Sequence, residues 1–154
     1  MTIENTNDLN GVLMQKTKRT GLRIRTNKVD PEVALAVLRF AKWLRMYYVF
    51  PIRVPIYLYP EEKIYAKDGD LCYSIFFEPF NKNCEPYIKV ATGDFLIKKK
   101  EIGRDNALAG ILSSIAYQLQ FYFCWCKGKK NSAAQARSKS ITMINKYSLT
   151  VDHP

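Results

Sequence analysis

The sequence predicts an α+β domain in which a twisted sheet of three to four strands packs on an N-terminal helix and a long central helix, followed by a C-terminal helix. Three observations predict this class. The chain has 154 residues, the usual size of one domain. Short apolar runs typical of strands occupy its middle, and longer runs with helical periodicity flank them. We expect one domain over residues 20–147, between tails at 1–19 and 148–154.

The first elements follow from local patterns. Residues 1–19 are polar and aperiodic, which predicts a flexible tail. The run GLRIRT, residues 21–26, alternates apolar residues with arginines, as a strand with one buried face does. Asp30 followed by Pro31 is typical of a helix start, and the helical repeat continues to about Tyr47.

The middle of the chain predicts strands. In IRVPIYLY, residues 52–59, Pro55 lacks a backbone donor, so we expect it at a sheet edge or a bulge. The KDGD at 67–70 is a turn signal. The runs LCYSIFFEP and PYIKVATG predict two further strands that pair as a hairpin.

Two helices complete the domain. GRDNA, residues 103–107, opens the long central helix with Asp105 or Asn106 as its N-cap, and Gly128 closes it. The final helix covers about residues 132–147. The tail beyond it, which we expect to be frayed, carries the only histidine, His153.

The central helix has two stripes at helical spacing. The first is ordinary core facing the sheet: Leu108, Leu112, Ile115, Leu119 and Tyr122. The second lies on another side and becomes aromatic: Gly110, Ser114, Tyr117, Phe121 and Trp125. This pattern predicts a helix buried between the sheet and the last helix, and it leaves open whether Tyr117 and Phe121 line a cleft or sit in sealed core.

The blocks FPIRVPIYL, PYIKVATGD and GRDNALAGILSSIAYQLQFYFCW, in this order, resemble a group of small bacterial zincin-type metallopeptidase homologues over about residues 21–147. In that group the long helix carries HExxH, followed by an aromatic residue and a tryptophan. The resemblance implies a zincin-like domain with a degenerate metal site. Tyr117 and Phe121 take the two histidine positions, Gln118 takes that of the catalytic glutamate, and Ala133, in AAQA, takes that of the third ligand.

The chemistry of HExxH needs residues that this chain lacks. Two imidazoles four residues apart chelate zinc, and the intervening glutamate is the base for the bound water. Residues 20–147 contain no histidine. Cys124 and Cys126 diverge by about 200° on a helix and cannot chelate one ion together. We therefore predict an inactive pseudoenzyme that uses no metal or other cofactor and has no catalytic residue.

The resemblance also implies a role in binding or regulation. In zincins the edge strand beside the site pairs with extended substrate, and PYIKVAT takes that place here. The expected peptide-binding edge strand comprises Tyr87, Ile88, Lys89, Val90 and Ala91. The expected partner is a protein or a peptide.

An alternative function follows from the net charge of +10. Basic residues cluster at 16–28, 98–100 and 127–130, which is compatible with a small nucleic-acid-binding protein as well as with a solvated basic surface. The chain has neither a basic, apolar secretory start nor a run of about 18 uncharged apolar residues. We therefore expect a cytoplasmic protein that does not enter the membrane.

Overall fold

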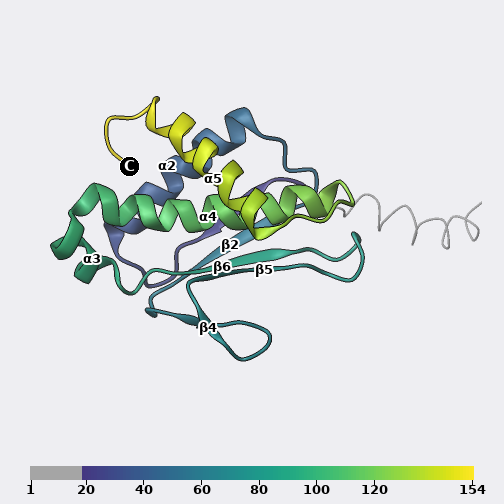
Figure 1. The fold of residues 1–154 in the computed structure, drawn as a ribbon, viewed down its shortest axis with the longest axis horizontal. Coiled ribbons are helices and arrows are strands. Elements are labelled where there is room, and N and C mark those ends of the chain that lie inside the picture. The colour runs from purple at the N-terminus through teal and green to yellow at the C-terminus, as the bar shows by residue number, and fades with distance from the viewer. Residues whose placement is uncertain (1–18) are drawn as a thin grey trace, which may run out of the picture.

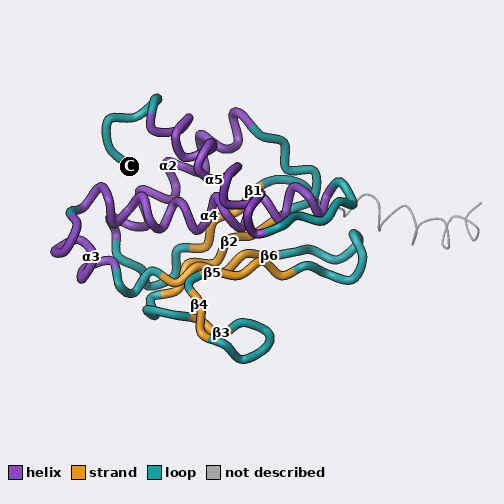
Figure 2. Tube along the Cα trace, viewed as in Figure 1, coloured by secondary structure: helices purple, strands orange, loops and turns teal. Residues whose placement is uncertain are grey.

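The computed structural model describes residues 19–154. This part of the chain forms four helices, a four-stranded mixed sheet and a separate two-stranded sheet (Figure 2). The predicted α+β composition is therefore confirmed.

The larger sheet has the strand order β1-β2-β6-β5. Its strands are β1 (Leu22–Arg25), β2 (Val54–Tyr59), β6 (Tyr87–Ala91) and β5 (Ser74–Phe77). The pairs β1–β2 and β2–β6 are parallel, whereas β5 runs antiparallel to β6. The predicted hairpin of the last two strands is thus confirmed, and β5 forms one edge of the sheet.

The segment predicted as one strand, LCYSIFFEP, divides at Tyr73. Its first part, β4 (Leu71–Cys72), pairs with β3 (Ile64–Tyr65) in the two-stranded sheet. The predicted KDGD turn closes this hairpin, with the Ala66 N–H donating to Asp70 O at 2.7 Å. The second part becomes β5.

The expectation that Pro55 marks an edge or a bulge is wrong, because β2 lies inside the sheet between β1 and β6. The Val54 N–H donates toward β1, to Gly21 O at 3.0 Å. Alternation along the strand turns the Pro55 nitrogen toward β6. The β2–β6 ladder starts only at the pair Ile56 and Ile88. No carbonyl of β6 within the ladder therefore lacks a hydrogen-bond donor because of Pro55.

Three helices cover one face of the sheet: α2 (Pro31–Tyr47), α4 (Arg104–Cys126) and α5 (Ala133–Ser148) (Figure 1). The predicted start of α2 is confirmed, since Asp30 Oδ1 accepts the Glu32 N–H at 2.8 Å. The last helix begins with a capping box, in which Ser132 Oγ accepts the Gln135 N–H at 3.1 Å.

A short helix before α4, α3 (Phe95–Ile102), was not predicted. Its sequence, FLIKKKEI, has no apolar stripe, and Phe95 is its only buried residue. The predicted N-cap of α4 is also wrong, whereas the predicted closure at Gly128 is confirmed, since Gly128 follows the helix end at φ 69°. Gly103, at φ 90°, ends α3 and immediately precedes α4, so Asp105 lies inside the first turn instead of capping it.

The first stripe of α4 is sealed core, as predicted: Leu108, Leu112, Ile115, Leu119 and Tyr122 are all at most 2 % exposed. Tyr122 Oη donates to Ile52 O and accepts the Ile52 N–H, which ties α4 to the segment before β2. Burial raises the pKa of Tyr122, so the phenol stays protonated and keeps donating. By length and composition α4 could span a membrane, but 56% of its most apolar window is buried in the fold, as in a core helix.

The C-terminal tail does not fray, contrary to expectation. Val151 packs against the core, and Thr150 donates to Tyr147 O from both its N–H and its hydroxyl. These contacts turn the chain back, and His153 Nδ1 lies 2.6 Å from Asp105 Oδ2 in the first turn of α4. Of the predicted N-terminal tail, residues 1–18 lie outside the described part, while Arg19 already binds Glu85 at 3.0 Å.

Candidate functional site: a groove along the edge of β5

Three of the four predicted metal-site positions lie together on the side of α4 that faces β5. The rings of Tyr117 and Phe121 are half-buried and meet edge to face, with centroids 5.2 Å apart. Gln118, at 8% exposed, donates from Nε2 to Ser74 Oγ at 2.9 Å. This turn of α4 is therefore held directly against the first residue of β5.

A cavity of about 1090 Å³ surrounds the outer edge of β5. We call it the edge groove. One wall is the α4 turn with Tyr117, Gln118 and Phe121, and the other is the β3–β4 turn, residues 65–68. Residues 74–78 form the floor between them. Tyr117 and Phe121 therefore line an open groove and are not sealed core.

The predicted peptide-binding edge strand is in the wrong place. The segment Tyr87, Ile88, Lys89, Val90 and Ala91 is β6, which pairs with β2 on one side and with β5 on the other. Its backbone groups are therefore engaged in the sheet. The edge strands are β1 and, on the side of the predicted site, β5, the other strand of the same hairpin. Alternating apolar residues predict that two strands pair, but not which of the two lies outside.

The phase of the β5–β6 ladder determines which β5 groups point outward. The Ala91 N–H donates to Tyr73 O at 2.7 Å, so Tyr73 and Ala91 form a hydrogen-bonded pair. In an antiparallel ladder such pairs alternate with non-bonded ones. The next position, Ser74 opposite Val90, is thus non-bonded, and so is Phe76 opposite Ile88. The backbone N–H and C=O groups of Ser74 and Phe76 therefore face away from β6, toward the edge groove, where the Ser74 N–H already meets the thiol of Cys72, a weak acceptor.

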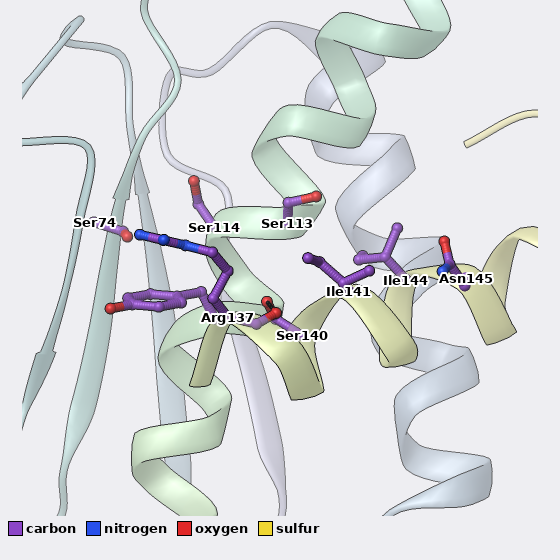
Figure 3. A pocket seen from close by; sticks show the side chains of 9 residues that line it. Ser74, Ser113, Ser114, Arg137, Ser140, Ile141, Ile144 and Asn145 are labelled. Atoms are coloured by element: carbon purple, nitrogen blue, oxygen red, sulfur yellow. Dashed lines mark hydrogen bonds between the residues drawn. The ribbon is translucent and has the colours of Figure 1, made fainter. Parts of the chain in front are cut away.

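The fourth predicted metal-site position, Ala133, does not join the others. It is the exposed first residue of α5 and lines none of the cavities around Tyr117. Arg137, one turn further along the helix, lies there instead. It lines a second cavity of about 390 Å³ between α4, α5 and β5, which shares Ser74 and Tyr117 with the edge groove (Figure 3). We call this cavity the arginine pocket.

Sequence reasoning missed Arg137, although a signal existed. Ala136, Ser140, Met143 and Tyr147 form the buried ridge of α5. Arg137 is next to this ridge and shares a side of the helix with Ile141 and Ile144, one and two turns on. A charged side chain next to the buried ridge of a helix lies at the border of the surface that the helix packs with. For α5 this border faces Ser74 (Figure 3).

The side chains at the four predicted metal-site positions do not fit zinc. Zinc sites in proteins use thiolate, imidazole or carboxylate donors, whereas these four residues supply a phenol, an amide, a phenyl ring and a methyl group. Within residues 19–154 no three His, Cys, Asp or Glu side chains gather in a metal-binding cluster. The groove therefore offers backbone hydrogen bonds and aromatic surface for binding.

The basic clusters are spread over the molecule. Lys99 Nζ and Arg104 Nε bind Glu32 at 2.6 and 2.7 Å, and the hydrogen bonds from Lys99 and then Arg104 hold the pKa of Glu32 below its ordinary value. Residues 127–130 follow the opposite end of α4, whose 23 residues span about 35 Å (Figure 1). Of the cluster at 16–28, residues 16–18 lie outside the described part.

Comparison of the chain with protein-family models, with curated proteins and with solved structures found no match. Function therefore has to be inferred from the groove itself.

Proposed function

We propose that the protein is a catalytically inactive, zincin-like binding module that captures an extended peptide along the free edge of β5. The observation that carries this proposal is the edge groove, in which outward-facing backbone groups of Ser74 and Phe76 lie between two walls. An exposed strand edge binds peptides by adding them as a further strand, and flanking pockets select side chains.

The walls of the groove suit an extended chain. Side chains of a bound strand alternate between the two faces of the sheet. On one face they would meet the rings of Tyr117 and Phe121, and on the other the β3–β4 turn together with Tyr87 and Lys89. Aromatic surface lies on one side, and on the other Lys67 and Lys89 are balanced by Asp68 and Glu78, which favours peptides with apolar residues on one face and polar residues on the other.

A pair of variants at Ser74 tests strand addition. Ser74→Pro removes the outward N–H and the hydroxyl, whereas Ser74→Ala removes only the hydroxyl, so the difference between them measures the N–H. Proline is tolerated at the first residue of an edge strand. The probe is a pool of random N-acetylated octapeptides, passed over immobilised protein and quantified by mass spectrometry. We expect Ser74→Pro to retain about two- to tenfold less peptide than Ser74→Ala, the range for one hydrogen bond.

A second probe checks the peptide side of the same bonds. The octapeptide pool with every backbone nitrogen methylated has no N–H left on either edge and cannot add as a strand, and we expect its retention to fall to the level of a blank column. Equal retention of the two pools, equal retention by the two Ser74 variants, or no retention by the wild-type protein would each contradict peptide capture by β5.

The zincin-like origin of the groove is tested by restoring ligands. Tyr117→His, Phe121→His and Arg137→Glu together place two imidazoles one helical turn apart beside a carboxylate from α5, which is a zinc site with one open position. We expect zinc binding at micromolar concentration by calorimetry. A matched variant carries Ala133→Glu in place of Arg137→Glu and should bind more weakly, because Ala133 lies away from the groove. If the folded first variant takes up no zinc, the metal-site correspondence is wrong.

A second candidate function is binding of single-stranded nucleic acid at the far end of α4. Phe80 is fully exposed at 105%, and Lys82 Nζ lies 5.9 Å from the Trp125 ring centre, close to the loop with Lys127, Lys129 and Lys130. Aromatic rings among lysines bind bases and phosphates together. Fluorescence anisotropy with labelled oligothymidylate should show binding that falls steeply with salt and weakens in Phe80→Ala. No binding at low salt would exclude this candidate.

A further inference from the structure

We infer that the arginine pocket binds the C-terminal carboxylate of the captured peptide, so that the protein selects peptide ends over internal segments. This inference rests on the proposed peptide capture by β5 and assigns a chemical class of ligand to a part of the site that β5 itself does not supply. Arg137 reaches from α5 across the pocket, and its guanidinium points toward Ser74, where the edge groove and the arginine pocket meet (Figure 3).

The pocket carries one positive charge and no negative one. Arg137 is the only charged residue of its lining, which otherwise consists of hydroxyl, amide and apolar side chains. None of the ion pairs among residues 19–154 uses Arg137. A guanidinium offers a planar fork of donors that matches a carboxylate in two parallel hydrogen bonds. The hydroxyl of Ser113 lines the same cavity and is available as a further donor, whereas that of Ser140 already donates to Arg137 O at 2.8 Å.

The single charge favours a carboxylate over a phosphate. A phosphate monoester carries a charge of about −1.5 to −2 at neutral pH and is bound by clusters of arginines. The pocket has no second cation to balance such a group. A carboxylate carries one charge and matches a lone arginine.

The direction of β5 explains why this carboxylate belongs to the peptide terminus. Ser74 contacts Gln118, and Phe76, two residues on, contacts Tyr122 and Trp125, so β5 and α4 run in the same direction. A strand added antiparallel to β5 therefore has its C-terminal end at Ser74, beside Arg137. A strand added parallel to β5 would bring its N-terminal end there, and a free α-ammonium group would be repelled by the guanidinium. Charge thus favours the antiparallel orientation.

The experiment compares the octapeptide pool as free acids with the same pool as C-terminal amides, on wild type and two variants. Arg137→Gln removes the guanidinium. Lys139→Gln removes the same charge from an exposed residue of α5 that lines neither cavity, and it is the matched control. We expect wild type and Lys139→Gln to retain free acids about tenfold better than amides, the lower end for hydrogen bonds to a charged group. Arg137→Gln should retain the free acids and the amides equally, at the level at which wild type retains the amides.

The outcomes separate this inference from the proposed function. If peptides are retained but acids and amides do not differ, peptide capture stands and the carboxylate site is wrong. A preference for acids that survives in Arg137→Gln, or that vanishes equally in Lys139→Gln, would also overturn the assignment to Arg137. If Arg137 instead enriches amidated peptides with internal Asp or Glu, the terminal assignment is wrong. No retention of either pool removes the proposed function and this inference together.

Discussion

The two stripes of α4 each carry a tyrosine, and the two tyrosines have opposite surroundings. On one side Tyr122 is fully buried and its phenol is bonded to the backbone of Ile52. On the other, Tyr117 and Phe121 are half-buried and border the edge groove. Both sides are aromatic and both follow the helical repeat. The difference comes from what each faces, because the sheet covers the stripe above its centre, whereas Tyr117 and Phe121 lie above its edge and stay open; Trp125, at the end of the same stripe, is buried.

The largest expected effect is on the sealed side. Tyr122→Ala removes a fully buried ring and should lower the free energy of unfolding by about 3–5 kcal/mol. Urea denaturation followed by circular dichroism measures the change. A loss below about 1 kcal/mol would mean that the two sides of α4 do not differ as described.

A smaller effect isolates the hydrogen bonds on the same side. Tyr122→Phe keeps the ring but leaves the N–H and C=O groups of Ile52 without this partner in a buried place. We expect a loss of about 1–3 kcal/mol by the same denaturation assay. A neutral result would show that the ring alone joins α4 to the segment before β2.

The open side should affect binding more than stability. Phe121→Ala removes a half-buried ring whose partner is Tyr117, and we expect a cost of no more than about 1 kcal/mol in unfolding free energy. Retention of the octapeptide pool should fall at the same time. A stability loss near that of Tyr122→Ala, with unchanged retention, would show that Phe121 belongs to the core.

The smallest effect concerns the returned C-terminal tail. The hydrogen bond with His153, followed by that from Arg104, holds the pKa of the Asp105 carboxyl below its usual range. A carboxyl with a lowered pKa in the folded state stabilises the fold above its unfolded-state pKa, and this contribution is lost as the pH falls through the folded-state value. Carboxyl titration by NMR should show the low pKa in wild type and a rise toward the ordinary value in His153→Ala. An unchanged pKa would mean that the tail does not hold Asp105 in solution.

Local signals were sufficient for those parts of the fold that local interactions determine. Asp30 and Pro31 mark the start of α2 because capping involves only neighbouring residues. The sealed stripe of α4 was predicted because helical spacing alone selects its members. Helix α3 was missed because FLIKKKEI has no apolar period and its contacts are long-range: Phe95 is buried in the core and Lys99 binds Glu32 of another helix.

The candidate site depended on long-range contacts, and there the sequence was less informative. It led to Tyr117, Gln118 and Phe121, which share one turn of a helix. It did not show that β5 lies outside β6, since both strands alternate alike and their order depends on pairing with β2, far away in the chain. Nor did the sequence predict that Arg137 lies near Ser74. This depends on how α5 is rotated against α4 and β5, which the loop between α4 and α5 helps to set.

The two walls of the edge groove also bear on self-association. An open strand edge such as Ile75, Phe76 and Phe77 is a template on which further copies of a sheet can grow, and proteins usually protect such edges with charge, proline or a covering element. Here α4 stands on one side of the edge and the β3–β4 turn on the other. The edge of β5 is therefore flanked on both sides by other elements of the chain. The same two walls that would hold a peptide are therefore also covering elements of the kind that limits edge-to-edge growth of a sheet.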